Sequence, residues 1–79
     1  MLLSDLPAGQ AATIERVDNR SDADSIAARL RDLGFVAGEP VRVVAHGLIG
    51  ADPLVVQIGF TRFALRRGEA ARVVVQAAA

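Results

Sequence analysis

Residues 40–76 read PVRVVAHGLIGADPLVVQIGFTRFALRRGEAARVVVQ. This stretch determines the fold that we predict for the chain. It holds four short segments rich in valine and other aliphatic residues, at 41–46, 54–58, 61–65 and 72–76. Apolar residues alternate through much of each segment, and glycine, proline or charged residues bound them, which is typical of strands. We therefore expect four short strands from this half of the chain.

The links between these four strands are short. Residues 47–53 supply a hairpin loop, and Gly59 suits a tight turn, although Phe60 is an unusual second residue for such a link. Residues 67–71 suit a single helical turn before the last strand.

One more strand is predicted near the N-terminus. Between residues 10 and 17, Ala12 and Ile14 stand beside polar neighbours, which is the period-two pattern of a half-buried strand. Five strands in so few residues, with the single helix described next, predict a mainly β fold. We expect a small, strongly bent sheet or β-barrel of about five strands with the helix plugging one side.

The helix is predicted over about residues 22–34. Ser21 with Asp24 three residues later resembles a capping box, so the helix should start there. Gly34 should end it, since glycine readily adopts positive φ. Phe35 should then fold back onto the last turn.

Alternation along the strands and the three-to-four spacing of the helix assign residues to a core. The predicted core consists of Ile14, Ile26, Leu30, Leu33, Val41, Val43, Leu54, Val56, Ile58, Phe63, Leu65, Val73 and Val75.

The opposite face of the strands keeps apolar residues beside arginines, and Val74 falls on it too. Exposed apolar patches often mark interaction sites, so we predict a docking face for a partner protein. Its candidate residues are Arg42, Val44, Val55, Arg62, Ala64, Arg66 and Arg72. The alternatives are that a loop or the segment Leu2-Leu3-Leu6 covers the apolar patch, and that the charges form only a solvated surface.

Length and composition restrict the class of protein. Seventy-nine residues allow one domain, residues 1–79, with the alanines at 77–79 expected to fray. There is no cysteine, no basic leader before an apolar run and no apolar run of membrane-spanning length, so we expect a cytoplasmic, unprocessed protein. Nine arginines balance nine acids, but residues 1–39 are net acidic and residues 40–79 net basic.

The chemistry of an enzyme is missing from the sequence. There is no cysteine, one histidine and no glycine-rich phosphate loop, so we expect no catalysis and no required cofactor. His46 and Asp52 lie across the hairpin loop and are the candidates for a weak surface divalent-metal site, completed by carboxylates of another copy. The alternative that we favour is an exposed histidine without a ligand role.

Two other binding modes are disfavoured. Recognition of proline-rich peptides needs an aromatic groove, and the chain has neither Trp nor Tyr. Nucleic-acid binding through the arginines of the second half is opposed by zero net charge and by the three Phe available for base stacking.

Motifs along nearly the whole chain resemble the FeoA family. They are L-x-x-L-x-x-G at 3–9, R-L-x-x-L-G-F-x-x-G at 29–38, V-R-V at 41–43, G-x-D-P-L at 50–54 and A-L-R-R-G-E-A at 64–70. The chain departs from the family at residues 59–62, which are bulkier than the usual short turn, and at Gly68. These departures leave the shape of that hairpin tip open.

The resemblance implies an SH3-like β-barrel with an inserted helix. It further implies an accessory protein that binds the cytosolic side of FeoB, the membrane permease that imports ferrous iron, and modulates uptake. The alternative is a metal-responsive regulatory module, because similar SH3-like domains end metal-dependent repressors. The absence of a DNA-reading helix-turn-helix favours the first function, and weak self-association stays open.

Overall fold

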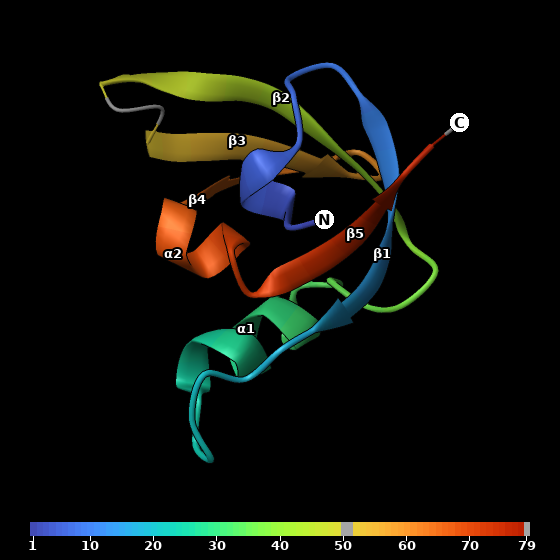
Figure 1. The fold of residues 1–79 in the computed structure, drawn as a ribbon. Coiled ribbons are helices and arrows are strands. Elements are labelled where there is room, and N and C mark those ends of the chain that lie inside the picture. The colour runs from blue at the N-terminus through green and yellow to red at the C-terminus, as the bar shows by residue number, and fades with distance from the viewer. Residues whose placement is uncertain (50–51, 79) are drawn as a thin grey trace.

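The computed structural model describes residues 1–49 and 52–78 and contains the mainly β fold that the sequence predicts (Figure 1). Its elements, in chain order, are a short 3-10 helix η1 (Leu3–Asp5), β1 (Ala11–Val17), α1 (Ser25–Asp32), β2 (Pro40–Ile49), β3 (Asp52–Ile58), β4 (Thr61–Leu65), α2 (Arg67–Ala70) and β5 (Val73–Ala77).

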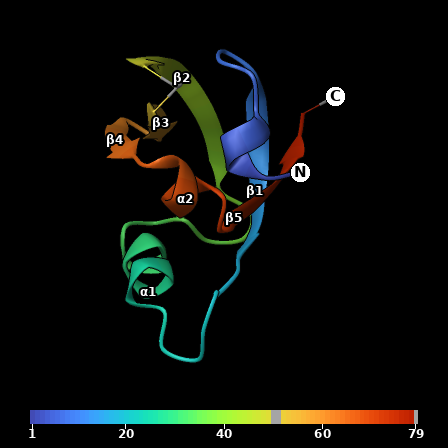
Figure 2. The ribbon, with the colours of Figure 1, turned by 60° about the vertical axis from the view of Figure 1, so that its left-hand side comes forward.

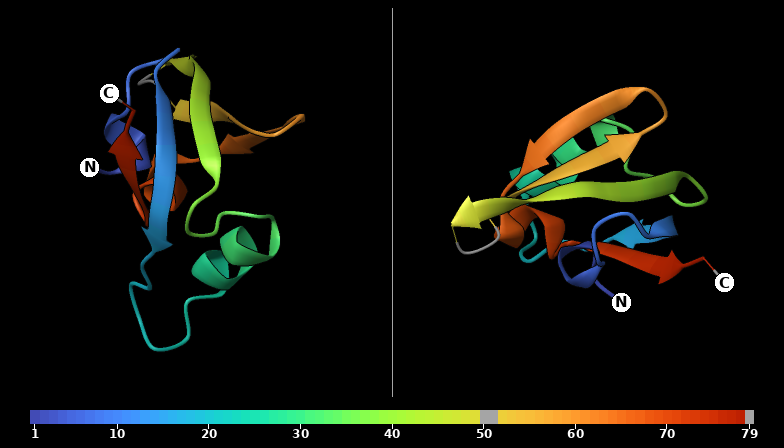
Figure 3. Two further views of the ribbon diagram at one scale, coloured as in Figure 1. Left: turned by 90° about the vertical axis from the view of Figure 1, so that its right-hand side faces the viewer. Right: turned by 90° about the horizontal axis from the view of Figure 1, so that it is seen from above.

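The five strands form one antiparallel sheet in the order β4-β3-β2-β1-β5. The sheet bends strongly, so that β3 and β4 face β1 and β5 across a gap that holds α2 (Figure 2). It does not close into a barrel, because β4 and β5 are its two edges and do not pair (Figure 3). The predicted mainly β fold with a strongly bent five-stranded sheet is confirmed, and the sheet stays open at one side.

The outer side of β5 is occupied by the N-terminus of the chain. The Met1 ammonium group donates a hydrogen bond to the Val75 carbonyl at 3.0 Å, and the Val75 amide donates to the Met1 carbonyl at 2.8 Å. Leu2 forms an isolated β-bridge with Val74. These contacts occupy the outer side of β5 around Val74 and Val75, where β4 would have to pair to close the sheet.

Strand boundaries differ from the prediction mainly at the β2–β3 hairpin. The predicted loop at 47–53 is wrong in extent, since β2 continues to Ile49 and β3 begins at Asp52. The remaining loop residues, 50–51, lie outside the described residues. By contrast, β4 occupies its predicted residues 61–65, because Gly59 adopts positive φ and allows the tight turn before it.

The helix α1 begins later than the sequence predicted. Asp24, not Ser21, is its N-cap, and one Asp24 carboxylate oxygen accepts hydrogen bonds from the amides of Ile26 at 3.1 Å and Ala27 at 3.2 Å. An N-cap aspartate satisfies backbone donors that the first helical turn leaves unpaired. The capping box predicted from Ser21 is therefore wrong, although its carboxylate does cap the helix.

The end of α1 agrees with the prediction. Gly34 has a φ of 109°, and the Phe35 amide donates to the Leu30 carbonyl at 3.0 Å while the Gly34 amide donates to the Arg31 carbonyl at 3.1 Å. This is a Schellman motif. It turns Phe35 into the core, where the ring is fully buried with its centroid 5.5 Å from that of Phe63.

Most of the predicted core is buried, with corrections at α1 and the N-terminus. Ile26 is 36% exposed, and three more predicted residues are only half-buried, namely Leu33, Ile58 and Phe63. Leu3 and Leu6 are instead fully buried, because η1 folds the N-terminal segment into the core. Further buried residues outside the prediction are Ala12, Val17, Ala27, Phe35 and Ala70.

The C-terminal elements follow the predicted order. The single helical turn α2 covers residues 67–70, and β5 runs from Val73 to Ala77. The Ala78 amide donates to the Ala11 carbonyl at 3.0 Å, so the last strand keeps a backbone contact beyond its end. No helix in the described ranges has the length and hydropathy needed to cross a membrane.

Candidate functional site

The outer face of β2, β3 and β4 carries two rows of cross-strand neighbours. In the first row, Arg42 lies opposite Gln57, and Gln57 lies opposite Arg62. Neighbouring strands lie about 4.8 Å apart, so the backbones of the two arginines are separated by roughly 10 Å. The structure thus brings together two of the predicted docking arginines on one exposed face.

The charges of this first row are not neutralised locally. The Arg62 Nε donates to the Gln57 side-chain oxygen at 3.1 Å, a neutral partner. Within the described residues, neither Arg42 nor Arg62 lies within ion-pair distance of a carboxylate. Sequence reasoning did not select Gln57, although the period of two along β3 places it on the same face as Val55.

The second row is apolar. Val55 lies opposite Ala45 on β2 and opposite Ala64 on β4. A register shift between Val43 and Ala45 inserts Val44 as an extra residue there, a β-bulge that leaves Val44 half-buried. We call these two rows together, with Val44, the outer face.

The N-terminal segment does not cover the outer face. Leu3 and Leu6 lie in the core, and Leu2 pairs with Val74 on β5, at the opposite edge of the sheet from β4. Val74 is consequently separated from the rest of the predicted apolar patch. The outer face keeps half-buried Val44 and Val55 at its centre.

Arg66 extends this surface at the end of β4, where it is exposed. Two acids hold the backbone around it: Glu69 accepts a hydrogen bond from the Arg66 amide at 2.7 Å, and Asp52 accepts one from the Arg67 amide at 3.0 Å. Because both acids bind main-chain amides at the start of α2, they fix the position of Arg66 after the strand.

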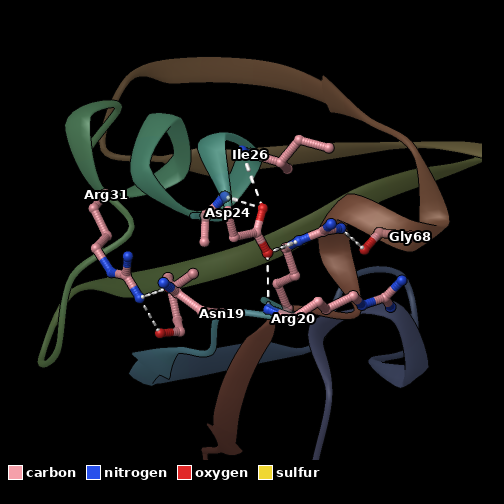
Figure 4. A network of polar contacts seen from close by, with 9 residues as sticks. Asn19, Arg20, Asp24, Ile26, Arg31 and Gly68 are labelled. Carbon is pink, nitrogen blue, oxygen red and sulfur yellow. Dashed lines mark hydrogen bonds and ion pairs between the residues drawn. The ribbon is translucent and has the colours of Figure 1, made fainter. Parts of the chain in front are cut away.

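Arg72, another predicted docking residue, lies in a different environment. Its side chain is only 11% exposed, and its Nε donates to the Asp24 carboxylate at 2.7 Å (Figure 4). A second guanidinium nitrogen donates to the Gly68 carbonyl at 2.7 Å. Arg72 therefore connects α1, α2 and β5 from within the molecule, apart from the outer face.

Asp24 is the acceptor at the centre of this network (Figure 4). Besides Arg72 and the first turn of α1, its carboxylate accepts a hydrogen bond from the Arg20 amide at 2.9 Å. Hydrogen bonds from Arg72, and then from the Arg20 and Ala27 amides, hold the pKa of Asp24 well below its usual range, although burial acts to raise it. Asp24 is thus kept ionised wherever the protein is folded at neutral pH.

The residues of the predicted metal site do not form a closed metal site. Asp52 accepts a hydrogen bond from the Arg67 amide, whereas the His46 Nδ1 is buried and has no hydrogen-bond partner in the part of the chain that the structure describes. Among residues 1–49 and 52–78, no three or more His, Asp or Glu side chains gather as a metal would require. The described residues alone therefore do not supply three protein ligands for a divalent ion at His46.

A strongly bent, open antiparallel sheet of five short strands, with one helix between the first two, defines a small SH3-like domain. The model of the FeoA domain matches residues 1–77. The chain therefore belongs to the FeoA family.

Solved structures agree with this assignment. The chain is 58% identical to FeoA of Stenotrophomonas maltophilia in complex with zinc, over 96% of this chain and 89% of that one, with a TM-score of 0.90. That protein is described as an SH3-domain protein and a candidate activating factor of ferrous iron transport. FeoA of Chlorobium tepidum is 33% identical over all of this chain and 71% of that one, with a TM-score of 0.84.

The fold is also found in a larger protein of another kind. IdeR of T. acidophilum matches 99% of this chain over 34% of its own length, with a TM-score of 0.78 and 17% identity. At that identity the match concerns the fold alone. The search of curated proteins gave no match.

Proposed function

We propose that this chain is a non-catalytic accessory protein of ferrous iron uptake, which acts in the cytoplasm by binding the cytosolic side of a FeoB-type permease and modulating transport. Membership of the FeoA family supports a role in iron transport. The S. maltophilia relative is described in the same terms.

The observation that carries the proposal is the outer face. Arg42 and Arg62 stand there without carboxylate partners in the described part of the chain, beside half-buried Val44 and Val55. An apolar centre with guanidinium groups at its rim resembles the anatomy of protein interfaces, in which arginine is enriched. Arg66 continues this rim beyond β4.

Metal is not required by this function. The zinc in the S. maltophilia structure makes metal binding by this chain worth testing, but Asp52 binds the Arg67 amide, and no group of three or more ligating side chains gathers among the described residues. We expect any divalent ion at His46 to bind weakly and to take its other ligands from a second copy of the chain.

The alternative function is a metal-responsive regulatory module. The likeness of the fold to a domain of IdeR is the observation in its favour. Such a module would bind its protein target only in the presence of metal, whereas an accessory protein of the permease would bind that partner with or without metal.

The test is biolayer interferometry with the purified cytosolic portion of the permease. Wild type should bind, and the double variant Arg62→Glu/Arg66→Glu should bind at least tenfold more weakly, since reversing two charges removes electrostatic complementarity with the partner. A tenfold loss corresponds to about 1.4 kcal/mol. The matched control is Arg16→Glu/Arg20→Glu, which changes the net charge equally at two exposed residues away from the outer face. Failure of wild type to bind would refute the proposed function. Equal weakening of binding by both double variants would refute the outer face as the docking surface.

A further inference from the structure

The outer side of β4 is an open sheet edge. Residues 61–65 pair with β3 on one side, and no further backbone hydrogen bond joins them to another element of the described chain. The other edge strand, β5, has its outer side covered by Met1 and Leu2. An exposed edge presents a row of unpaired N–H and C=O groups on which another strand can be added.

A groove runs along this open edge. Its lining consists of four consecutive residues of β4, 62–65, of Glu69 in α2, and of residues on one side of α1 and its C-cap, namely Ile26, Arg29, Leu30 and Leu33. Successive side chains of a strand point to opposite faces, so a groove that meets four in a row follows the side of the strand. Its volume is about 270 Å³, and residues of α1 line the side opposite β4.

The two sides of this groove differ in chemistry. Toward α1 the groove offers apolar side chains, with Ile26 exposed and Leu33 and Phe63 half-buried, and two charged residues, Arg29 and Glu69, also line it. Toward the outer face, β4 presents Arg62, and Arg66 follows it. Neither arginine has a carboxylate partner among the described residues, so this side carries uncompensated positive charge.

We propose that the edge of β4 is the docking site for an extended segment of a partner protein in which apolar and acidic side chains alternate. This inference rests on the proposed function and names the part of the surface that would hold the permease. The segment would add a sixth strand to the sheet. Its apolar side chains would enter the groove beside Ile26, and its carboxylates would lie beside Arg62 and Arg66.

Alternation is required by the geometry of an added strand. Side chains of a paired strand lie on the same faces as those of its neighbour, at period two. Positions level with Phe63 and Leu65 would face α1, where an apolar side chain loses water-exposed area. Positions level with Arg62 and Ala64 would face outward, where a carboxylate meets a guanidinium group.

The test uses synthetic capped heptapeptides and the full-length protein labelled with ¹⁵N. The probe peptide alternates valine and glutamate. One control replaces glutamate by lysine, and a second carries N-methyl groups on alternate peptide bonds, which remove strand pairing but keep every side chain. The probe should slow hydrogen exchange of the β4 amides that do not bond to β3, and both controls should bind at least about tenfold more weakly.

A matched pair of variants tests the groove. Ile26→Glu places a carboxylate in the groove and should abolish binding of the probe. Val36→Glu makes the same change at a residue that is 44% exposed and not part of the lining, and should leave binding unchanged. Both positions are exposed, so neither variant should impair folding.

The outcomes separate this inference from the proposed function. If the permease portion binds but the β4 amides exchange as in the free protein, the edge site is refuted and the proposed function stands. If the protein alone self-associates and protects these amides, a second copy occupies the edge and the inference is overturned. If the permease portion fails to bind at all, the proposed function itself falls.

Discussion

Arg72 and Asp24 form a nearly buried ion pair, with 2.7 Å between the guanidinium Nε and the carboxylate oxygen. The pair joins the residue that precedes β5 to the N-cap of α1, across 48 residues of sequence. Because Arg72 also donates to the Gly68 carbonyl, one side chain fixes α1, α2 and β5 relative to one another. The helix wall of the β4 groove depends on this connection.

The ion pair makes stability depend on pH. The pKa of Asp24 is lowered in the folded protein, chiefly by the hydrogen bond from Arg72. The contribution of the ionised Asp24 carboxylate to the free energy of unfolding is therefore complete above the unfolded-state pKa of about 4. It is lost as the pH falls further, toward the folded-state pKa. We expect the melting temperature of wild type to drop steeply below pH 4.

The variant Asp24→Asn isolates this effect. It should melt at a lower temperature than wild type at pH 7, since Arg72 is left nearly buried without its counter-charge. The difference should narrow as pH falls below about 4, because the wild-type carboxylate is then protonated as well. Calorimetry from pH 7 to pH 2 measures this, with Asp22→Asn, an exposed neighbour, as control. A constant difference across the range would contradict the assignment.

The N-terminal segment is part of the core. Leu3 is fully buried in η1, so Leu3→Ala should destabilise the fold by about 2–5 kcal/mol, as for other large-to-small core substitutions. Urea unfolding followed by circular dichroism measures it. Val36→Ala, at an exposed position, should cost less than about 0.5 kcal/mol. Equal effects of the two variants would show that the N-terminal segment does not pack as described.

The sequence predicts strands more reliably than it predicts this N-terminal packing. Both ends of β4, at residues 61 and 65, could be predicted correctly, because the turn at Gly59 and the alternation of apolar residues indicate the same bounds. Leu3 and Leu6 gave no such signal, since a single 3-10 turn is too short to show a period. Ile26 fits the helical spacing of a core residue, yet it lies in the first turn of α1 and remains exposed.

The candidate site was predictable to a similar degree. Period two placed Arg42, Val55 and Arg62 on one face, and the sheet register agrees. The same rule could not distinguish Arg72 from these arginines, because its partner Asp24 is distant in sequence. The alternation of residues along a strand predicts which face a side chain occupies. An ion pair between residues distant in sequence depends on tertiary packing, which this pattern does not contain.

The tip of the β3–β4 hairpin carries a fully exposed aromatic residue, Phe60. Because the ring buries no area, Phe60→Ser should change the free energy of unfolding by less than about 0.5 kcal/mol. Phe35→Ala, at a buried ring, should cost about 3–5 kcal/mol. Chemical denaturation of both variants makes the comparison. A large loss at Phe60 would mean that the tip packs against the protein.

Removal of metal should leave the fold unchanged. No cluster of three or more ligating side chains lies in the described ranges, so stability comes from burial and backbone pairing. We expect the same melting temperature with and without a chelator, and zinc titration should move the His46 imidazole resonances only at high zinc concentration. A chelator-induced fall of several degrees, or saturation at equimolar zinc, would contradict this.

The outer face as the docking surface is tested most directly by methyl NMR of the valine-labelled protein with the cytosolic portion of the permease. The methyl signals of Val44 and Val55 should shift or broaden on binding, while those of Val73 and Val75, fully buried in β5, should not. Perturbation confined to valines away from β2 and β3, with Val44 and Val55 unmoved in a saturated complex, would contradict the account.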